Sequence, residues 1–291
     1  MLAGVIHQIM SGIATGGIYA SVALALVMIY QSTHHVNFAQ GEMAMFSTYI
    51  AWAMMQAGLP YWAAFMLTVV LSFGMGALIE FTVIRPVRDA PVLSVVVVFI
   101  GLLVIFHSLA GWLFGYTIKQ FPSPFPSNAW YGSTFMSPHE VGAIGVTLTV
   151  MLVLFMFFRF TPLGLAMRAA AQNPVSSRLV GINVSRMLML GWGLAGAVGA
   201  IGGMMVAPVV FLDPGMMSGV LIYAFAGALI GGIDNPAGAV LGGFIVGVLE
   251  NLIGTYVVGT ELKLSVALVL IVGVLIVRPS GLLGRTIVTK V

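Results

Sequence analysis

Cysteine is absent from the 291-residue chain, and charged residues are scarce. Without cysteine the chain can hold no disulfide, no thiol nucleophile and no cysteine-ligated metal. Charged side chains make up 7% of the sequence, whereas a typical soluble domain carries about 25%. So few charges could not cover a water-facing surface, which excludes an ordinary soluble fold.

Motifs for nucleotide and ester or peptide hydrolysis are also missing. The chain has no GxxxxGK[ST] phosphate-binding loop, so it should not hydrolyse ATP by itself. It has neither HExxH nor GxSxG, the motifs of zinc proteases and serine hydrolases. His34 and His35 are adjacent and would face different directions on a helix, which makes them poor joint metal ligands. We therefore expect a protein that is not an enzyme and that binds neither metal nor cofactor itself.

What the chain has instead is hydrophobic sequence: 60% of its residues are apolar and its mean hydropathy is +1.11. Apolar runs between charged or proline-containing breaks predict membrane-spanning helices. We expect an all-α polytopic membrane protein with about 8–9 transmembrane helices, forming a single domain over residues 1–291. The predicted spans are residues 5–30, 38–57, 61–84, 92–114, 140–160, 187–211, 218–232, 237–258 and 264–277.

The basic residues indicate how the chain is oriented in the membrane. Arginines are confined to Arg85 and Arg88, the segment 159–186, and the tail after the last predicted span. Because cytoplasmic loops carry an excess of basic residues, these places and the C-terminus are expected in the cytoplasm. An even number of spans must then follow the 159–186 segment, which favours a short crossing at 218–232; a re-entrant half-helix there is the alternative. The basic residues form no patch interleaved with aromatics, so we expect membrane lipid and no nucleic acid as a partner.

Glycine is abundant, with 36 residues, many of them inside predicted spans. Glycines spaced by four let helix backbones approach closely in lipid, and tight packing is the simplest interpretation of any one pair. Their density in 191–247, interrupted by Asp234, Asn235 and Pro236, also suits a region that lines a pathway or changes shape. The pairs are Gly12/Gly16, Gly199/Gly203, Gly227/Gly231, Gly238/Gly242 and Gly243/Gly247.

Two acidic residues, Glu42 and Glu250, lie inside predicted spans. Charges at such positions are costly and usually face a bundle interior or a cavity. Each has two interpretations: a polar side chain that satisfies neighbouring backbone groups, or part of a pathway. The candidate pathway residues are Asn37, Gln40, Glu42, Tyr19, Tyr223 and Glu250. A third acidic residue, Glu80, lies near the arginines at a predicted cytoplasmic end, where ion pairing or snorkelling is expected.

The longest polar stretch on the expected cytoplasmic side is the loop 159–186. Asn173 as N-cap, a proline directly after it and Gly181 as the C-terminal stop predict a short helix there. Val175 and Leu179, four residues apart, would give this helix a small apolar face. Such a helix would either dock into a groove on a cytoplasmic partner or lie on the lipid surface, and composition alone leaves both open.

Five sequence motifs, each present once, follow one another along nearly the whole chain. They are 36–42, Glu80 with 85–88, 164–183, 231–243 and 279–285. Together they resemble the permease subunits of branched-chain amino-acid ABC importers, the LivH type. The resemblance implies the fold of an ABC-importer permease in the bacterial inner membrane.

The resemblance also implies partners and a mechanism. A permease of this type pairs with a second, related permease to form the translocation pathway, two ATP-binding subunits that use the ATP dock on the cytoplasmic side, and a periplasmic binding protein delivers substrate. The loop 159–186 would then couple the ATPases to the permeases. The coupling residues implied are Arg168, Ala169, Ala170, Leu179, Gly181 and Ile182.

Two positions depart from the family pattern. Gln40 stands where the family usually has histidine, and 232–236 replaces the usual glycine hairpin. Relatives of this family carry urea, short amides or aromatic acids, so these are alternatives to branched-chain or other small apolar amino acids as substrate. The alternative of another class is a secondary transporter or channel that works without ATP, which would also explain glycine-rich helices interrupted by polar residues.

Overall fold

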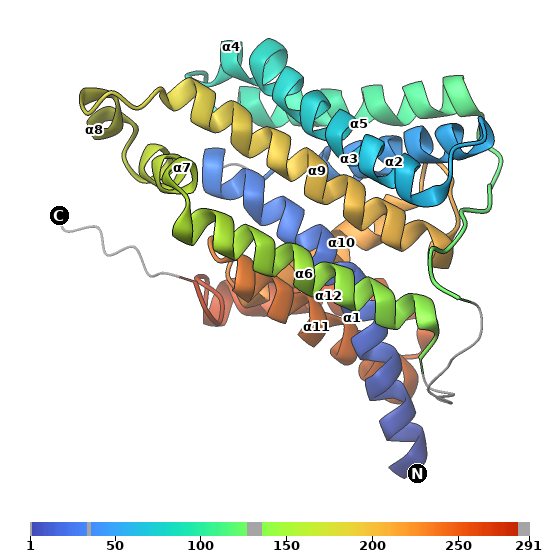
Figure 1. Ribbon diagram of the computed structural model, residues 1–291. Helices are drawn as coiled ribbons and strands as arrows, with labels where there is room; N and C mark the ends of the chain where they lie inside the picture. The colour runs from blue at the N-terminus through green and yellow to red at the C-terminus, as the bar shows by residue number, and fades with distance from the viewer. Residues whose placement is uncertain (1, 34–35, 127–135, 285–291) are drawn as a thin grey trace. The chain divides into compact units, whose positions relative to one another are not determined.

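The computed structural model describes residues 2–33, 36–126 and 136–284. Within these ranges the secondary structure is helical, apart from one antiparallel bridge between Lys119 and Leu212 (Figure 1). The α-helices are α1 (Leu2–Thr33), α2 (Gln40–Gln56), α3 (Tyr61–Ile79), α4 (Arg85–Val87), α5 (Val92–Phe114), α6 (Pro138–Phe160), α7 (Pro162–Gln172), α8 (Pro174–Leu179), α9 (Val184–Val210), α10 (Met217–Gly231), α11 (Pro236–Ile253) and α12 (Lys263–Val277). The π-helical segments are η1 (Glu80–Ile84) and η2 (Gly254–Val258), and η3 (Thr260–Leu262) is a 3₁₀ turn.

Every predicted span corresponds to a helix, with ends that differ by a few residues. Six helices are long and apolar enough to cross a membrane, and α10 and α12 are shorter apolar helices. The expectation of an all-helical, multi-pass membrane protein is therefore confirmed, whereas the expected count of 8–9 crossings stays a prediction. The six long spans are Gly4–Gln31, Tyr61–Val87, Val92–Phe114, Pro138–Phe160, Val184–Val210 and Pro236–Val258.

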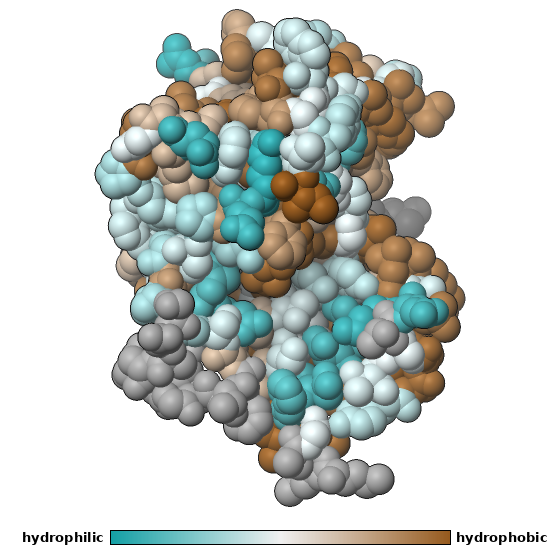
Figure 2. All heavy atoms as spheres, turned by 90° about the vertical axis from the view of Figure 1, so that its right-hand side faces the viewer, coloured by the Kyte–Doolittle hydropathy of each residue, from teal (hydrophilic) through white to brown (hydrophobic). Residues whose placement is uncertain are grey.

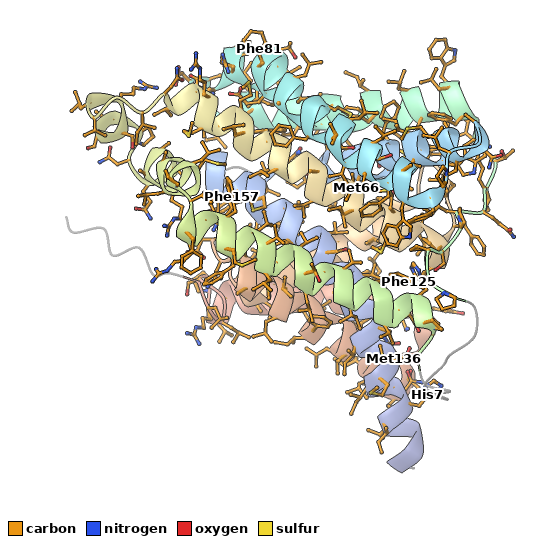
Figure 3. The ribbon with its side chains drawn as sticks, in the orientation of Figure 1. His7, Met66, Phe81, Phe125, Met136 and Phe157 are labelled. Carbon is orange, nitrogen blue, oxygen red and sulfur yellow. The ribbon has the colours of Figure 1, made fainter. Side chains whose placement is uncertain are left out.

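Large apolar side chains are exposed along these helices. Met66 and Val70 of α3 and Val104 and Trp112 of α5 are each more than half exposed, and Met66 is labelled in Figure 3. Figure 2 shows hydrophobic side chains, in brown, over large parts of the face that it draws. Soluble monomers rarely expose such continuous apolar surface, whereas a lipid-facing surface requires it.

The chain divides into two compact units, each discontinuous in sequence. Unit 1 comprises Met1–Val27, Phe125–Leu148 and Gly219–Val291, and unit 2 comprises Met28–Pro124 and Thr149–Ser218. The helices α1, α6 and α10 therefore contribute residues to both units. The expectation of a single domain over residues 1–291 stays a prediction.

In unit 1, the glycine pairs of α1 and α11 pack against the facing helix. A Cβ added to Gly12 would lie 2.6 Å from the Cα of Val248, and one added to Gly16 would lie 2.7 Å from the Cα of Phe244. A side chain at either position would collide with backbone, so only glycine allows this approach. Tight helix packing is confirmed for these pairs.

The residues after α12 pack against the loop between α10 and α11. The backbone N–H of Leu282 donates to the carbonyl of Ile230 at 2.8 Å, and that of Leu283 donates to Gly231 at 2.9 Å. The Asn235 amide in turn donates to the Leu283 carbonyl at 3.0 Å. Two of the five motifs, 231–243 and 279–285, are thereby hydrogen-bonded to each other at one end of unit 1. The residue Arg285, which completes the last of them, lies outside the described residues.

In unit 2, α3 and α9 lie side by side with their backbones in close contact (Figure 1). A Cβ on Gly76 of α3 would strike the carbonyl of Trp192, and one on Gly196 of α9 would strike the carbonyl of Ser72. The helix α2 packs against both α3 and α9, and Ser72 donates a hydrogen bond to Ser47 of α2 at 2.8 Å. These contacts hold α2, α3 and α9 together as the core of the unit.

Candidate functional site

Three of the predicted pathway residues come together in unit 1. The Tyr19 hydroxyl of α1 donates a hydrogen bond to Oε2 of Glu250 on α11 at 2.7 Å. The rings of Tyr19 and Tyr223 stack with their centroids 4.8 Å apart. Glu250 is only 5% exposed, and a carboxylate buried among apolar helices needs such partners to offset its desolvation.

Lys263, at the start of α12, completes this group. Its Nζ lies 3.7 Å from Oε1 of Glu250 and 3.3 Å from Oδ1 of Asn251. The chain between α11 and α12 passes through the π-helical segment Gly254–Val258, which precedes the turn back to Lys263. This contact could not be predicted from the sequence, because no local pattern indicates which carboxylate a lysine between two spans will reach.

The other three pathway candidates lie at the start of α2 in unit 2. Asn37 and Gln40 are fully buried. The Asn37 side-chain oxygen accepts a hydrogen bond from the backbone N–H of Ala39 at 3.0 Å, so this residue shapes the turn into α2. The Gln40 amide donates to the carbonyl of Ala195 on α9 at 3.2 Å. Asn37 and one end of Gln40 thus bond backbone groups, and a role of these residues in a pathway stays a prediction.

Glu42 meets a histidine that the sequence analysis did not single out. Its Oε2 lies 3.5 Å from Nδ1 of His107 on α5, and Glu42 is 5% exposed. His107 could have been identified from the sequence, because it is a lone imidazole inside the apolar run 92–114 and a polar group within a span needs a partner. The Glu42 carboxylate therefore faces an imidazole at close range, without a hydrogen bond to its Oε2.

The start of α2 lies beside the middle of the helices it contacts. Gln40 bonds Ala195, near the centre of α9, and Glu42 faces His107, well inside α5. Both α5 and α9 are long enough to span a membrane. The polar beginning of α2 thus lies beside the middle of two helices that are long enough to span a membrane.

The predicted helix in the loop 159–186 is present as α8, with the predicted caps. Asn173 accepts a hydrogen bond from the N–H of Ser176 at 3.0 Å, and Gly181 has a φ of +86°, which favours glycine. A further helix, α7, precedes it, with Thr161 accepting from the N–H of Gly164 at 3.0 Å.

The six predicted coupling residues divide into an inward and an outward set. Ala170 is buried and packs with Val184 and Leu188 of α9, and Ile182 packs against the same cluster. Arg168, Leu179 and Gly181 are exposed, and Ala169 is half-buried. Leu179, at 84% exposure, presents an apolar side chain to the surroundings. The loop is therefore packed against α9 through Ala170 and Ile182. Its exposed residues, Arg168, Leu179 and Gly181, remain accessible on the surface of the chain.

Glu80 forms the ion pairs expected of it. This carboxylate, 1% exposed at the end of α3, accepts hydrogen bonds from Arg85 at 3.0 Å and from Arg88. Among the described residues, no group of three or more His, Asp or Glu side chains is arranged to hold a metal ion. His34 and His35 lie outside the described residues.

Comparison with known proteins places the whole chain alongside transport permeases. The family model described as "Branched-chain amino acid transport system / permease component" matches residues 8–275. The permease protein LivH of the high-affinity branched-chain amino acid transport system of Escherichia coli is 31% identical, over 98% of this chain and 97% of the relative. The corresponding BraD of Pseudomonas aeruginosa is 31% identical over 98% of both chains.

One solved structure supports the fold independently of close sequence similarity. PsaBC from Streptococcus pneumoniae, in complex with Fab, superposes with a TM-score of 0.52 over 96% of this chain and 97% of that chain. Its sequence identity is 13%. At that identity the likeness shows a shared fold and nothing about substrate.

Proposed function

Because the chain belongs to the family of permease components of branched-chain amino acid transport systems, we propose that it carries branched-chain or other small apolar amino acids through the membrane. It is the permease subunit of an ABC importer. The observation that carries this function is the family match over residues 8–275 in a chain whose described part is a bundle of apolar helices. A secondary transporter or channel is not favoured.

The proposed partners are a second related permease, two ATP-binding subunits and a periplasmic substrate-binding protein. The ATP would be used by the partner subunits, and this chain would bind no cofactor. The exposed apolar side chains of Leu179 and Val180 at the end of α8 support a docking surface for an ATP-binding subunit. Burial of such side chains in a partner's groove is worth more than leaving them in water.

The proposed topology has nine crossings, made by the six long spans together with α2, α10 and α12. The N-terminus would lie outside and the C-terminus in the cytoplasm of the bacterial inner membrane. Packing of Leu282 and Leu283 against the loop between α10 and α11 supports this topology, because that loop and the segment after α12 must lie at the same end if α10, α11 and α12 alternate in direction.

The proposed pathway residues are Asn37, Gln40, Glu42, Tyr19, Tyr223 and Glu250, to which the contacts add His107 and Lys263. An amino acid carries both an ammonium and a carboxylate group. In unit 1, Glu250 offers an acceptor for the first and Lys263 a donor for the second. In unit 2, Glu42 by itself offers an acceptor for an ammonium group. Urea, short amides and aromatic acids are the alternative cargoes in the same importer class.

Two measurements test the assembly and the substrate separately. Affinity purification of the chain, expressed with its neighbouring genes, should recover a second permease and two ATP-binding subunits by mass analysis. Calorimetric titration of the neighbouring binding protein should show tight binding of leucine, isoleucine or valine. Recovery of the chain without an ATPase contradicts the importer, and binding of urea or an amide in place of these amino acids contradicts the substrate.

A further inference from the structure

The buried carboxylate of Glu80 lies where α3 continues into α4, and one of its arginine partners reaches the end of the coupling loop at the start of α9. Glu80 is the first residue of the π-helical segment Glu80–Ile84, which continues α3 into α4. Its two oxygens are divided between two arginines: Oε2 accepts from Arg85 and Oε1 from Arg88. π-Helical turns inside α-helices are rare and occur frequently at functional sites. The two arginines thus fix the position of the Glu80 carboxylate.

The two arginines differ in what else they contact. Arg88 also donates a hydrogen bond, from Nη1 to the Ser185 hydroxyl at 3.3 Å, and so reaches α9. Arg85 instead places its guanidinium 4.6 Å from the ring centroid of Phe81, on its own helical segment. Phe81 is labelled in Figure 3 beside α4. Only Arg88 of this pair therefore connects α3 to another helix through the contacts described.

Ser185 is the second residue of α9, the helix that follows α7 and α8 and against which α7 packs. The preceding Asn183 caps α9 by accepting from the N–H of Arg186 at 3.1 Å. The buried Ala170 of α7 packs on Val184, directly next to Ser185. The end of α7 and the first turn of α9 are consequently packed together, next to Ser185.

Further along, α3 and α9 touch through backbone at glycines. Gly76 lies against the carbonyl of Trp192, and Gly196 against that of Ser72. At these two positions the contact is made by backbone, whereas the Phe73 ring of α3 packs against Gly193 of α9. Helices packed in this way can still move relative to one another by small shear displacements. A tie between the cytoplasmic ends would make the two helices move together.

We infer that Glu80, Arg88 and Ser185 form a latch that transmits displacement of the coupling loop to α3. Arg88 and Glu80 are positioning residues in this scheme, since they touch neither substrate nor nucleotide. The inference rests on the proposed function, because it needs an ATPase that moves the loop. The geometry predicts that the latch sets how strongly substrate arrival at the outside raises ATP hydrolysis inside.

The test uses the complex with its partner subunits, reconstituted in vesicles. ATP hydrolysis is measured without binding protein and with substrate-loaded binding protein, and the ratio is compared between variants. Arg88→Ala should lower this ratio about fivefold or more, the lower range of a typical coupling between sites. Arg85→Ala is the matched control: it removes the other partner of Glu80 but leaves the connection to α9, so its ratio should stay close to that of the unmodified complex.

A second variant covers the case in which Arg88→Ala fails to assemble. Ser185→Ala removes one hydroxyl and leaves the Glu80 ion pairs in place, and it too should lower the ratio. Because the chain contains no cysteine, Arg88→Cys with Ser185→Cys can then be joined by a short, reducible bifunctional thiol reagent. Cross-linking should restore the ratio and reduction should lower it again, a response that a purely structural role would not produce.

The outcomes separate the latch from the function on which it rests. An unchanged ratio in Ser185→Ala and in the uncross-linked double-cysteine variant overturns the latch. An equal loss in Arg85→Ala and Arg88→Ala also overturns it, because the connection to α9 would then be irrelevant. Absence of ATP-dependent uptake by the unmodified complex contradicts the proposed function itself.

Discussion

Tyr19 of α1 and Glu250 of α11 are joined by a 2.7 Å hydrogen bond inside unit 1, although 231 positions separate them in the chain. The carboxylate is shared with Lys263, which approaches from the start of α12. The group therefore links three helices. It is either a structural tie or part of the pathway, and the two roles predict different responses to substitution.

Removing the hydrogen bond alone is the mildest test of this group. Tyr19→Phe keeps the stacked ring but leaves Glu250 without its hydroxyl donor, which should cost about 1–3 kcal/mol of stability. Thermal unfolding of the purified complex in detergent measures this. Tyr223→Phe is the matched control, since it preserves the stacking partner and the Tyr19–Glu250 bond; an equal loss of stability in both variants would contradict the assignment.

Removing the charges of both Lys263 and Glu250 distinguishes a purely structural role of this pair from a role in the transport pathway. Lys263→Met leaves Glu250 without its cation and should destabilise the complex by less than the about 3–5 kcal/mol of a fully buried pair, because the lysine side chain is 25% exposed. Adding Glu250→Gln should recover most of that stability, because no uncompensated charge remains. If the residues line the pathway, uptake stays low in the double variant. Recovery of uptake together with stability would show that the pair is only structural.

The start of α2 is expected to matter for transport more than for assembly. Glu42→Gln keeps the shape of the side chain but removes its charge opposite His107, and Asn37→Ala removes the acceptor for the Ala39 N–H. Both variants should assemble in near-normal yield and show uptake reduced roughly tenfold, a typical coupling effect. Size-exclusion yield and initial uptake rate are the two measurements. Normal uptake in both variants would make this segment a packing feature.

The coupling loop should respond where it is exposed. Leu179→Glu changes a side chain that is 84% exposed, so the stability of the chain should be unaffected while docking of an ATP-binding subunit is weakened. Arg168→Ala and Gly181→Val should act in the same direction, the latter because a branched side chain is strained at a φ of +86°. Each should lower substrate-stimulated ATP hydrolysis and leave the affinity of the binding protein intact. Unchanged hydrolysis and transport in all three would remove the coupling assignment.

Local features of the fold could be predicted from the sequence. Helix ends were recoverable because apolar runs, prolines and charges mark them within a few residues, and α8 was recoverable because Asn173, Pro174 and Gly181 act on their own neighbours. The pairing of α1 and α11 was only partly predictable: four-residue glycine spacing indicates close packing but does not name the facing helix.

Contacts between distant residues could not be predicted in the same way. Which carboxylate Lys263 reaches, and that His107 faces Glu42, depend on how whole helices pack. The π-helical segments were missed because their sequences, such as Glu80–Ile84, carry no mark that distinguishes them from α-helix. Glu80 begins one of these segments and Glu250 precedes the other, and although the ion pairs of Glu80 were predicted, the contact between Glu250 and Lys263 was not.

The most direct test of the account is ATP-driven uptake by the assembled complex. Proteoliposomes that contain this chain with its partner permease and ATP-binding subunits are loaded with ATP, and labelled leucine is added outside with the binding protein. The account predicts uptake that requires ATP, the binding protein and this chain together. Uptake by the purified chain alone, without ATP, would contradict it.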